Sequence, residues 1–140
     1  MWCARWRGRS MSSELAVPSQ ALRFVVVGAL AATTHWLTAM LAMQWIVPLV
    51  ANIVGFCCAF PVSFAGHFHW SFRGHGALWL HALPRFAAVA LSSFAGNELL
   101  YAALLAWTPW HPGVSLFITL LVVAASTFAL SRGWAFVKRH

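Results

Sequence analysis

Four long runs of hydrophobic residues dominate the chain, and polar residues gather in the short segments between them. The runs cover residues 24–47, 49–68, 86–107 and 114–131. A helix needs about 20 apolar residues to cross a hydrocarbon core of about 30 Å, and each run is close to that length. The connections near Pro48 and Pro109 are only a few residues long. The pattern therefore predicts an all-α integral membrane protein with four transmembrane helices, paired as two hairpins.

The second half of the chain repeats the first. Each half opens with an Arg-Phe pair and closes its second apolar run with the motif Phe-x5-Trp-x-Phe, which occupies residues 64–72 and 128–136. One hairpin unit is thus used in tandem, as residues 23–72 and 85–136. Aromatic rings prefer the interface between membrane and water. We therefore expect four of these side chains to be interface anchors: Trp70, Phe72, Trp134 and Phe136.

The composition supports a membrane protein independently of the pattern. Hydrophobic residues make up 61% of the chain and charged residues only 8%, whereas soluble domains carry about 25% charged residues. So few charges cannot cover a surface that faces water. We expect residues 1–20 to be a disordered cytoplasmic tail and residues 21–140 to be the membrane domain.

Basic residues set the expected orientation. The net charge is +7, and all nine Lys and Arg lie in the N-terminal tail, the central loop or the C-terminal segment, with none in the hairpin connections. Basic segments stay on the cytoplasmic side, which predicts cytoplasmic termini and two hairpins inserted in parallel. This placement suits a multi-pass protein of the cytoplasmic membrane in contact with anionic lipid, and it does not suit nucleic-acid binding.

Several of these features resemble the GtrA-like family of small four-helix membrane proteins. The features are the Arg-Phe opening of a Gly-containing first run, Asn52-Ile53 early in the second run, and the doubled Phe-x5-Trp-x-Phe ending. The resemblance extends from Arg23 to Phe136. It implies a role in cell-surface polysaccharide synthesis and O-antigen glycosylation, by flipping a polyprenyl-phosphate-linked sugar from the cytoplasmic to the outer leaflet.

This chain departs from the family pattern at the two Asn positions that precede the Trp of each copy, where other polar residues stand. The family usually has Asn-Phe-x-x-Asn, followed by Arg or Lys, before the Trp. Ser63 and His67 stand at the two Asn positions in the first copy, and Thr127 and Ser131 in the second. His35 stands where the first run of the family often carries an acidic residue.

Glu98 is the strongest candidate for a functional residue inside the membrane. It lies near the middle of the third run, where a carboxylate must face the bundle interior, pair or take up a proton. The repeat places His35 at the depth of Asn97 and Glu98, so we expect a His–Glu pair. These groups either line a sugar path or form a structural hydrogen bond. The expected intramembrane polar set is His35, Asn52, Asn97 and Glu98.

The arginines near the cytoplasmic ends of the runs are candidates for binding the lipid phosphate. A guanidinium group forms two parallel hydrogen bonds with phosphate. The alternative is that they only fix topology and contact anionic lipid. The four positions are Arg23, Arg73, Arg85 and Arg132.

The residues present do not predict catalysis, a metal site or a cofactor. The chain has two acidic residues, Glu14 and Glu98, and the first lies in the tail, so the carboxylate pair of a glycosidase is missing. His67 and His69 are two apart and would diverge on a helix, which argues against a shared metal ion. No phosphate-binding Gly-rich loop occurs.

Two other functions fit the same pattern. One is a proton-coupled exporter of small molecules built around the membrane carboxylate, and the other is a non-transporting membrane anchor for a glycosyltransferase. Because four helices leave little room for a closed path, we expect a homo-oligomer or a complex with a membrane glycosyltransferase.

Overall fold

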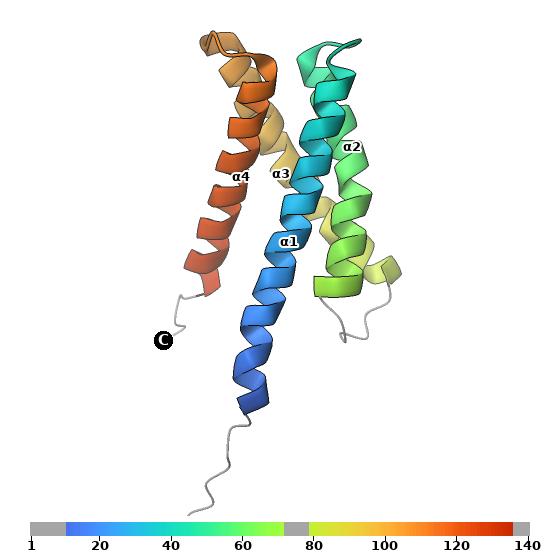
Figure 1. The fold of residues 1–140 in the computed structure, drawn as a ribbon, viewed down its shortest axis with the longest axis vertical. Coiled ribbons are helices and arrows are strands. Elements are labelled where there is room, and N and C mark those ends of the chain that lie inside the picture. Colours follow the sequence, from blue (N-terminus) through green and yellow to red (C-terminus); the bar gives the residue numbers. More distant parts are fainter. Residues whose placement is uncertain (1–10, 72–78, 136–140) are drawn as a thin grey trace, which may run out of the picture.

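The computed structural model describes residues 11–71 and 79–135, and the side chains of 21–70 and 79–127. Within these ranges the chain is helical apart from two short connections, and no strand occurs (Figure 1). The helices are α1 (Met11–Ala42), α2 (Pro48–Gly66), α3 (Trp79–Trp107) and α4 (Pro112–Ala135), and a π-helical turn, η1 (His67–Ser71), continues α2. The predicted all-α architecture with four helices is confirmed.

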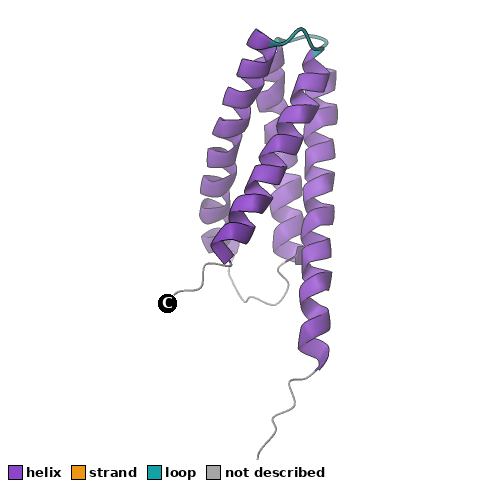
Figure 2. Ribbon diagram, turned by 90° about the vertical axis from the view of Figure 1, so that its left-hand side faces the viewer, coloured by secondary structure: helices purple, strands orange, loops and turns teal. Residues whose placement is uncertain are grey.

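The helices form two hairpins that point the same way. The connection between α1 and α2 and the connection between α3 and α4 lie at one end of the molecule, called here the connection end (Figures 1 and 2). The other end, where α2 ends and α3 begins, is called the terminal end. Within the bundle α1 packs mainly on α2, and α3 packs mainly on α4. This parallel arrangement is the one that the sequence repeat predicts.

Proline begins the second helix of each hairpin. Pro48 and Pro112 are the first residues of α2 and α4, where the missing N–H has no intrahelical partner to lose. In the second hairpin His111 also supports the start of α4, because its Nδ1 atom accepts a hydrogen bond of 3.1 Å from the Gly113 N–H. These turns return the chain into the membrane within a few residues.

Small residues of α2 allow it to lie close against α1. Ala51, Gly55 and Ala59 are spaced four apart and are all buried. A Cβ atom added at Gly55 would lie 2.6 Å from His35 Cδ2 and 2.7 Å from its carbonyl oxygen. Small residues at this spacing let helix backbones approach closely in membranes. The two helices therefore approach each other most closely at Gly55 of α2. Gly28 of α1 also lies among small residues, but it has open space around it.

The interior of the bundle is more polar than its outside. Polar side chains are buried on α1, α2, α3 and α4, whereas large apolar side chains such as Leu99 and Val89 face outward. Lipid tails are as apolar as leucine, so this distribution suits hydrocarbon surroundings and would be unfavourable in water. The buried polar residues are His35, Asn52, His67, Asn97, Ser115 and Thr119.

Exposed tryptophans lie toward both ends of the bundle. Trp45, Trp107 and Trp110 are exposed at the connection end, and Trp70 and Trp79 are exposed at the terminal end. Indole rings favour the membrane–water interface. Three segments between these levels are long and apolar enough to span a membrane, and the described side chains of α4 add a shorter apolar helix: Ala21–Ala42, Pro48–Trp70, Trp79–Trp107 and Pro112–Thr127.

Two expected boundaries are wrong. Residues 11–20, which we assigned to a disordered tail, are the first turns of α1, because extending a packed helix is far cheaper than nucleating one. Residues 79–84, part of the central loop that we expected over residues 73–84, already belong to α3, with Pro84 inside the helix. The proline follows the helix start by little more than a turn, so few backbone hydrogen bonds are affected.

Candidate functional site

A chain of hydrogen bonds joins three helices inside the bundle. Asn52 of α2 lies at its centre and is fully buried. Its Oδ1 atom is 2.6 Å from Nε2 of His35 on α1. Its Nδ2 atom donates to Oδ1 of Asn97 at 2.9 Å and to Oε2 of Glu98 at 2.6 Å, both on α3. The structure thus brings together the four polar residues expected inside the membrane.

The repeat explains why these residues meet. His35 and Asn97 occupy equivalent positions of the first helix in each hairpin, 62 residues apart, and both are buried. The equivalent helices α1 and α3 therefore present polar groups at the same depth. Asn52 lies between them and forms hydrogen bonds with His35 and Asn97 at the same time, because a side-chain amide has one acceptor oxygen and two N–H donors.

The expected direct His–Glu pair is not what the structure shows. His35 and Glu98 are linked through Asn52, which accepts from one side and donates to the other. The physical reason is the close packing of α1 on α2 at Gly55. That contact brings Asn52, one turn from Gly55, against His35, so α2 and not α3 supplies the partner of the ring.

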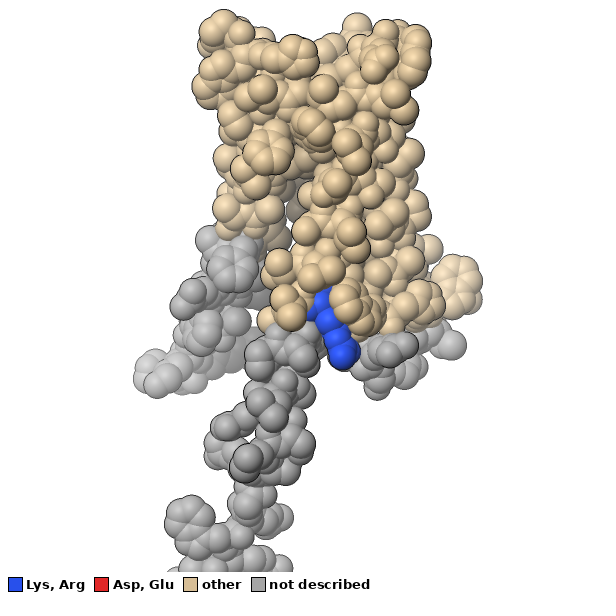
Figure 3. All heavy atoms as spheres, in the orientation of Figure 1, with Lys and Arg blue, Asp and Glu red and all other residues tan. Residues whose placement is uncertain are grey.

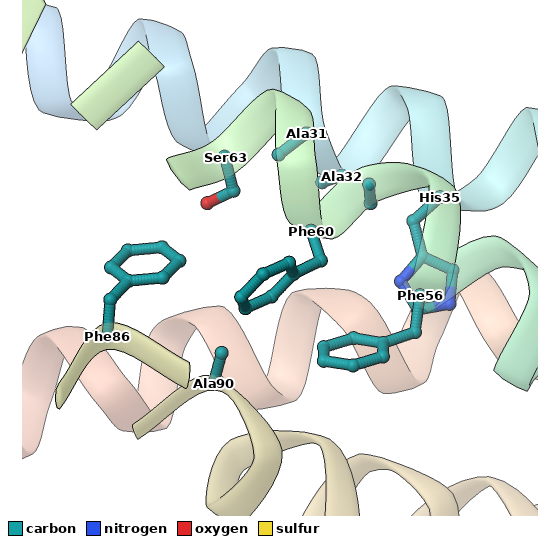
Figure 4. A pocket seen from close by; sticks show the side chains of 9 residues that line it. Ala31, Ala32, His35, Phe56, Phe60, Ser63, Phe86 and Ala90 are labelled. Carbon is teal, nitrogen blue, oxygen red and sulfur yellow. The ribbon is translucent and has the colours of Figure 1, made fainter. Parts of the chain in front are cut away.

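A cavity of about 140 Å³ extends from this cluster toward the terminal end. His35 and Phe56 lie at one end of it, and Ser63 and Phe86 lie at the other (Figure 4). Phe56 and Phe60 point from α2 toward α3, where Phe86 faces them (Figure 4). Small side chains make up the remaining wall: Ala31, Ala32, Ala59 and Ala90.

The phenyl rings beside the cavity also hold α2 against α3. Phe56 stacks on Phe94 with ring centroids 4.3 Å apart, and Phe60 lies 5.7 Å from Phe86. Phe64, one turn further along, is 5.4 Å from the same Phe86 ring. The sequence analysis marked Phe64 and Phe86 only as parts of the repeated motifs and did not place any of these rings beside a cavity, although the spacing of four between Phe56, Phe60 and Phe64 places them on one helix face.

The basic side chains that the structure describes lie toward the terminal end. Arg23 of α1 is half-buried and Arg85 of α3 is exposed. On the face in Figure 3, basic surface appears only at this end, and no acidic surface is visible. Arg85 directly precedes Phe86 in α3, so a basic residue is next in sequence to a residue at the outer end of the cavity, although Arg85 itself is exposed and does not line the cavity. Arg73 lies outside the described residues, and Arg132 lies in α4 where only the backbone is described.

Of the expected anchors, Trp70 is the one whose side chain is described. It lies in the π-helical turn η1 and is exposed, as an interface residue should be. Trp134 lies in α4 without a described side chain, and Phe72 and Phe136 lie outside the described residues. The same turn begins with His67, which is buried, and its ring is 4.6 Å from that of Phe24.

Two more hydrogen bonds to backbone atoms lie near the connection end. Trp36 Nε1 of α1 donates to the carbonyl oxygen of Gly113 on α4 at 3.0 Å, which joins the two hairpins. The Tyr101 hydroxyl of α3 donates to the carbonyl oxygen of Pro112 on α4 at 3.2 Å, within the second hairpin. The sequence analysis missed both, because their partners are backbone atoms that no side-chain pattern reveals. Across the described part of the chain, no three His, Cys, Asp or Glu side chains are grouped to hold a metal ion.

Comparison with known proteins gives one match. Residues 23–136 match the family described as GtrA/DPMS, transmembrane domain. No curated protein and no solved structure is similar enough to count as a match. The matched segment begins at the Arg-Phe pair of the first repeat and ends at the last Phe of the second, so it covers both hairpins and every residue of the polar cluster.

Proposed function

The chain belongs to the GtrA/DPMS transmembrane-domain family, and from that premise we propose that it translocates a polyprenyl-phosphate-linked sugar across the cytoplasmic membrane. Family membership gives the broader role, which is sugar handling at a membrane in polysaccharide synthesis and glycosylation. The proposed step delivers the sugar to the outer leaflet for modification of surface polysaccharide such as O-antigen.

The observation that carries this proposal is the cavity between the basic end and the polar cluster. A cavity of similar size, about 150 Å³, holds a benzene ring in an engineered protein, so 140 Å³ is on the scale of the ring atoms of one sugar without its substituents. The C–H face of a sugar ring can lie on a phenyl ring, and its hydroxyls need a few polar partners. His35 and Ser63 offer such partners among the three phenyl rings.

The phosphate of the same lipid would stay near the terminal end. Arg23 and Arg85 offer guanidinium groups there, and guanidinium binds phosphate through paired hydrogen bonds. With the phosphate held at Arg85, the sugar would enter the cavity beside Phe86. The expected orientation, with the basic end in the cytoplasm, makes this the loading position.

The proposed step moves a molecule without changing its bonds, which agrees with the residues present. The family is generally associated with a non-catalytic, flippase-like role, and the whole chain contains two acidic residues. A glycosyltransferase in the same membrane would supply the lipid-linked sugar. We propose that the protein acts as a homo-oligomer or together with such an enzyme, because one four-helix bundle offers only a small cavity.

Reconstitution tests the proposal directly. Purified protein is placed in liposomes with a fluorescent polyprenyl-phosphate-glucose, and an impermeant reagent reports the lipid that reaches the other leaflet. We expect faster exchange than in protein-free liposomes. Basal exchange, together with normal recovery of a partner glycosyltransferase on the protein, would support the anchor function instead. Proton flux without lipid exchange would support the exporter.

A further inference from the structure

The polar cluster beside the cavity contains one acidic side chain and no described Lys or Arg. Glu98 is the one acidic residue among the described membrane segments, and its Oε2 atom accepts from the neutral amide of Asn52. The other amide in the cluster, Asn97, is neutral as well. The described arginine on the same helix, Arg85, is thirteen residues away, which is about 20 Å along a helix. No described basic side chain of Lys or Arg lies at the depth of Glu98.

This carboxylate lies close to the inner end of the cavity. Only two hydrogen bonds and the amide group of Asn52 separate it from the His35 ring, which lines the cavity. Phe94, one turn before Glu98 on α3, stacks on Phe56 of the same wall. Glu98 itself does not line the cavity, but it is only partly buried and is linked through Asn52 to the His35 ring that does.

We propose that Glu98 selects the headgroup by charge, so that the path takes sugars that are neutral or carry an amine and excludes sugars that carry a carboxylate. This inference rests on the proposed function. A carboxylate accepts several hydrogen bonds, which the hydroxyl or ammonium groups of a sugar can donate. An anionic sugar would instead bring a second negative charge into surroundings of low dielectric constant, where like charges repel strongly.

The same charge separates the two parts of the lipid-linked sugar. While the lipid loads, Arg23 and Arg85 attract its phosphate at the terminal end, and Glu98 disfavours a second anionic group, carried on the sugar, that enters ahead of the phosphate. Specificity often depends on such a repulsive element as well as on attractive contacts. In the loading step the sugar therefore enters first, toward Asn52 and Glu98, and the phosphate follows it.

Three lipids that differ only in the sugar test this selection in liposomes: polyprenyl-phosphate glucose, glucosamine and glucuronic acid. For the wild-type protein we expect glucose and glucosamine to exchange at least about tenfold faster than glucuronic acid, the order of effect expected for an unscreened like charge nearby. Glu98→Gln should bring the glucose-to-glucuronate ratio near one, and Glu98→Asp should keep it high. Glu14→Gln removes the same charge from residues 11–20, outside the membrane segments, and should leave the ratio unchanged.

The outcomes separate the two proposals. If no lipid exchanges faster than in protein-free liposomes, the proposed function itself fails. If glucose and glucuronic acid exchange equally fast in the wild-type protein, translocation stands and charge selection is wrong. An unchanged ratio in folded Glu98→Gln protein also contradicts the role of Glu98. Should that variant not fold, the wild-type order of the three lipids still decides.

Discussion

At the residue scale, Asn52 holds more of the interior together than any other side chain in the cluster. It binds His35 on one helix and Asn97 and Glu98 on another. Hydrocarbon offers no water to replace a lost partner. The cost of removing Asn52 is therefore set by the groups it would leave unpaired.

Replacing Asn52 should destabilise the fold. Asn52→Leu keeps the approximate volume but leaves three polar groups without this partner, and a buried unsatisfied group costs about 1–3 kcal/mol. We expect a lower midpoint of thermal unfolding in detergent, measured by circular dichroism. Gln44→Leu, at an exposed position of a hairpin connection, is the control and should leave the midpoint nearly unchanged. Equal midpoints for the two variants would show that the cluster does not support the fold.

Glycine provides a second test with a matched control. Gly55→Ala places a methyl group 2.6 Å from the His35 ring and 2.7 Å from a backbone oxygen, so α1 and α2 must move apart. Overpacking of this kind costs about 1–3 kcal/mol. Gly28→Ala meets nothing within 4 Å and should be neutral or stabilising, because alanine favours the helix. The difference in thermal midpoint between the two variants checks this, and a Gly55→Ala protein as stable as Gly28→Ala would contradict the close approach.

Sequence reasoning found the members of the cluster but not its connections. The repeat offset places His35 level with Asn97, and the rarity of carboxylates in membranes marks Glu98. Which residue lies between them depends on how far α1 and α2 approach, and that distance is set by Gly55 and its neighbours in three dimensions. The sequence also did not place Phe56, Phe60 and Phe86 beside a cavity, because aromatic residues on a membrane helix fit a lipid-facing surface equally well.

At the scale of elements, the apolar runs predict the helices well and their ends poorly. Hydropathy reports where a segment can lie in hydrocarbon, whereas a helix stops where its backbone hydrogen bonds stop. Thus α1 extends toward the N-terminus to Met11 and α3 begins at Trp79, both beyond the apolar runs. The turns at Pro48 and Pro112 were easier to place, because proline at the first helical position has a direct backbone cause.

The end of each hairpin unit should act as an anchor more than as a binding site. Trp70 is exposed in η1, and Trp134 is its repeat equivalent. Trp70→Ala and Trp134→Ala should lower the amount of folded protein in the membrane, while each folded molecule keeps most of its activity. Trp70→Phe keeps an aromatic ring at the interface and should recover most of the yield. Normal yield with lost exchange activity in liposomes would instead indicate contact with the headgroup.

At the scale of the whole molecule, the internal repeat determines the architecture. Two hairpins of one sequence type must insert the same way if each keeps its basic ends in the cytoplasm, and the structure has both connections at one end (Figure 2). The repeat could not predict the unequal roles of the halves. The first hairpin supplies His35 and the bridging Asn52, whereas the second supplies the charge at Glu98.

The orientation of this architecture in the membrane gives the last prediction. The two hairpin connections hold no Lys or Arg, whereas the N-terminal, central and C-terminal segments of the sequence hold all nine, and basic segments resist translocation. Reporter fusions after residues 47 and 110 should therefore read outside, and fusions after residue 76 and at the C-terminus should read inside. The fusions after residues 47 and 76 test the first hairpin, and those after residue 110 and at the C-terminus test the second. The topology of each hairpin is therefore tested separately. A C-terminus outside with residue 76 inside would mean that α4 does not cross the membrane, and Arg132 would then lie on the side opposite Arg85. That result would remove the shared basic end from which the lipid phosphate is expected to load, while the polar cluster formed by α1, α2 and α3 would keep its place.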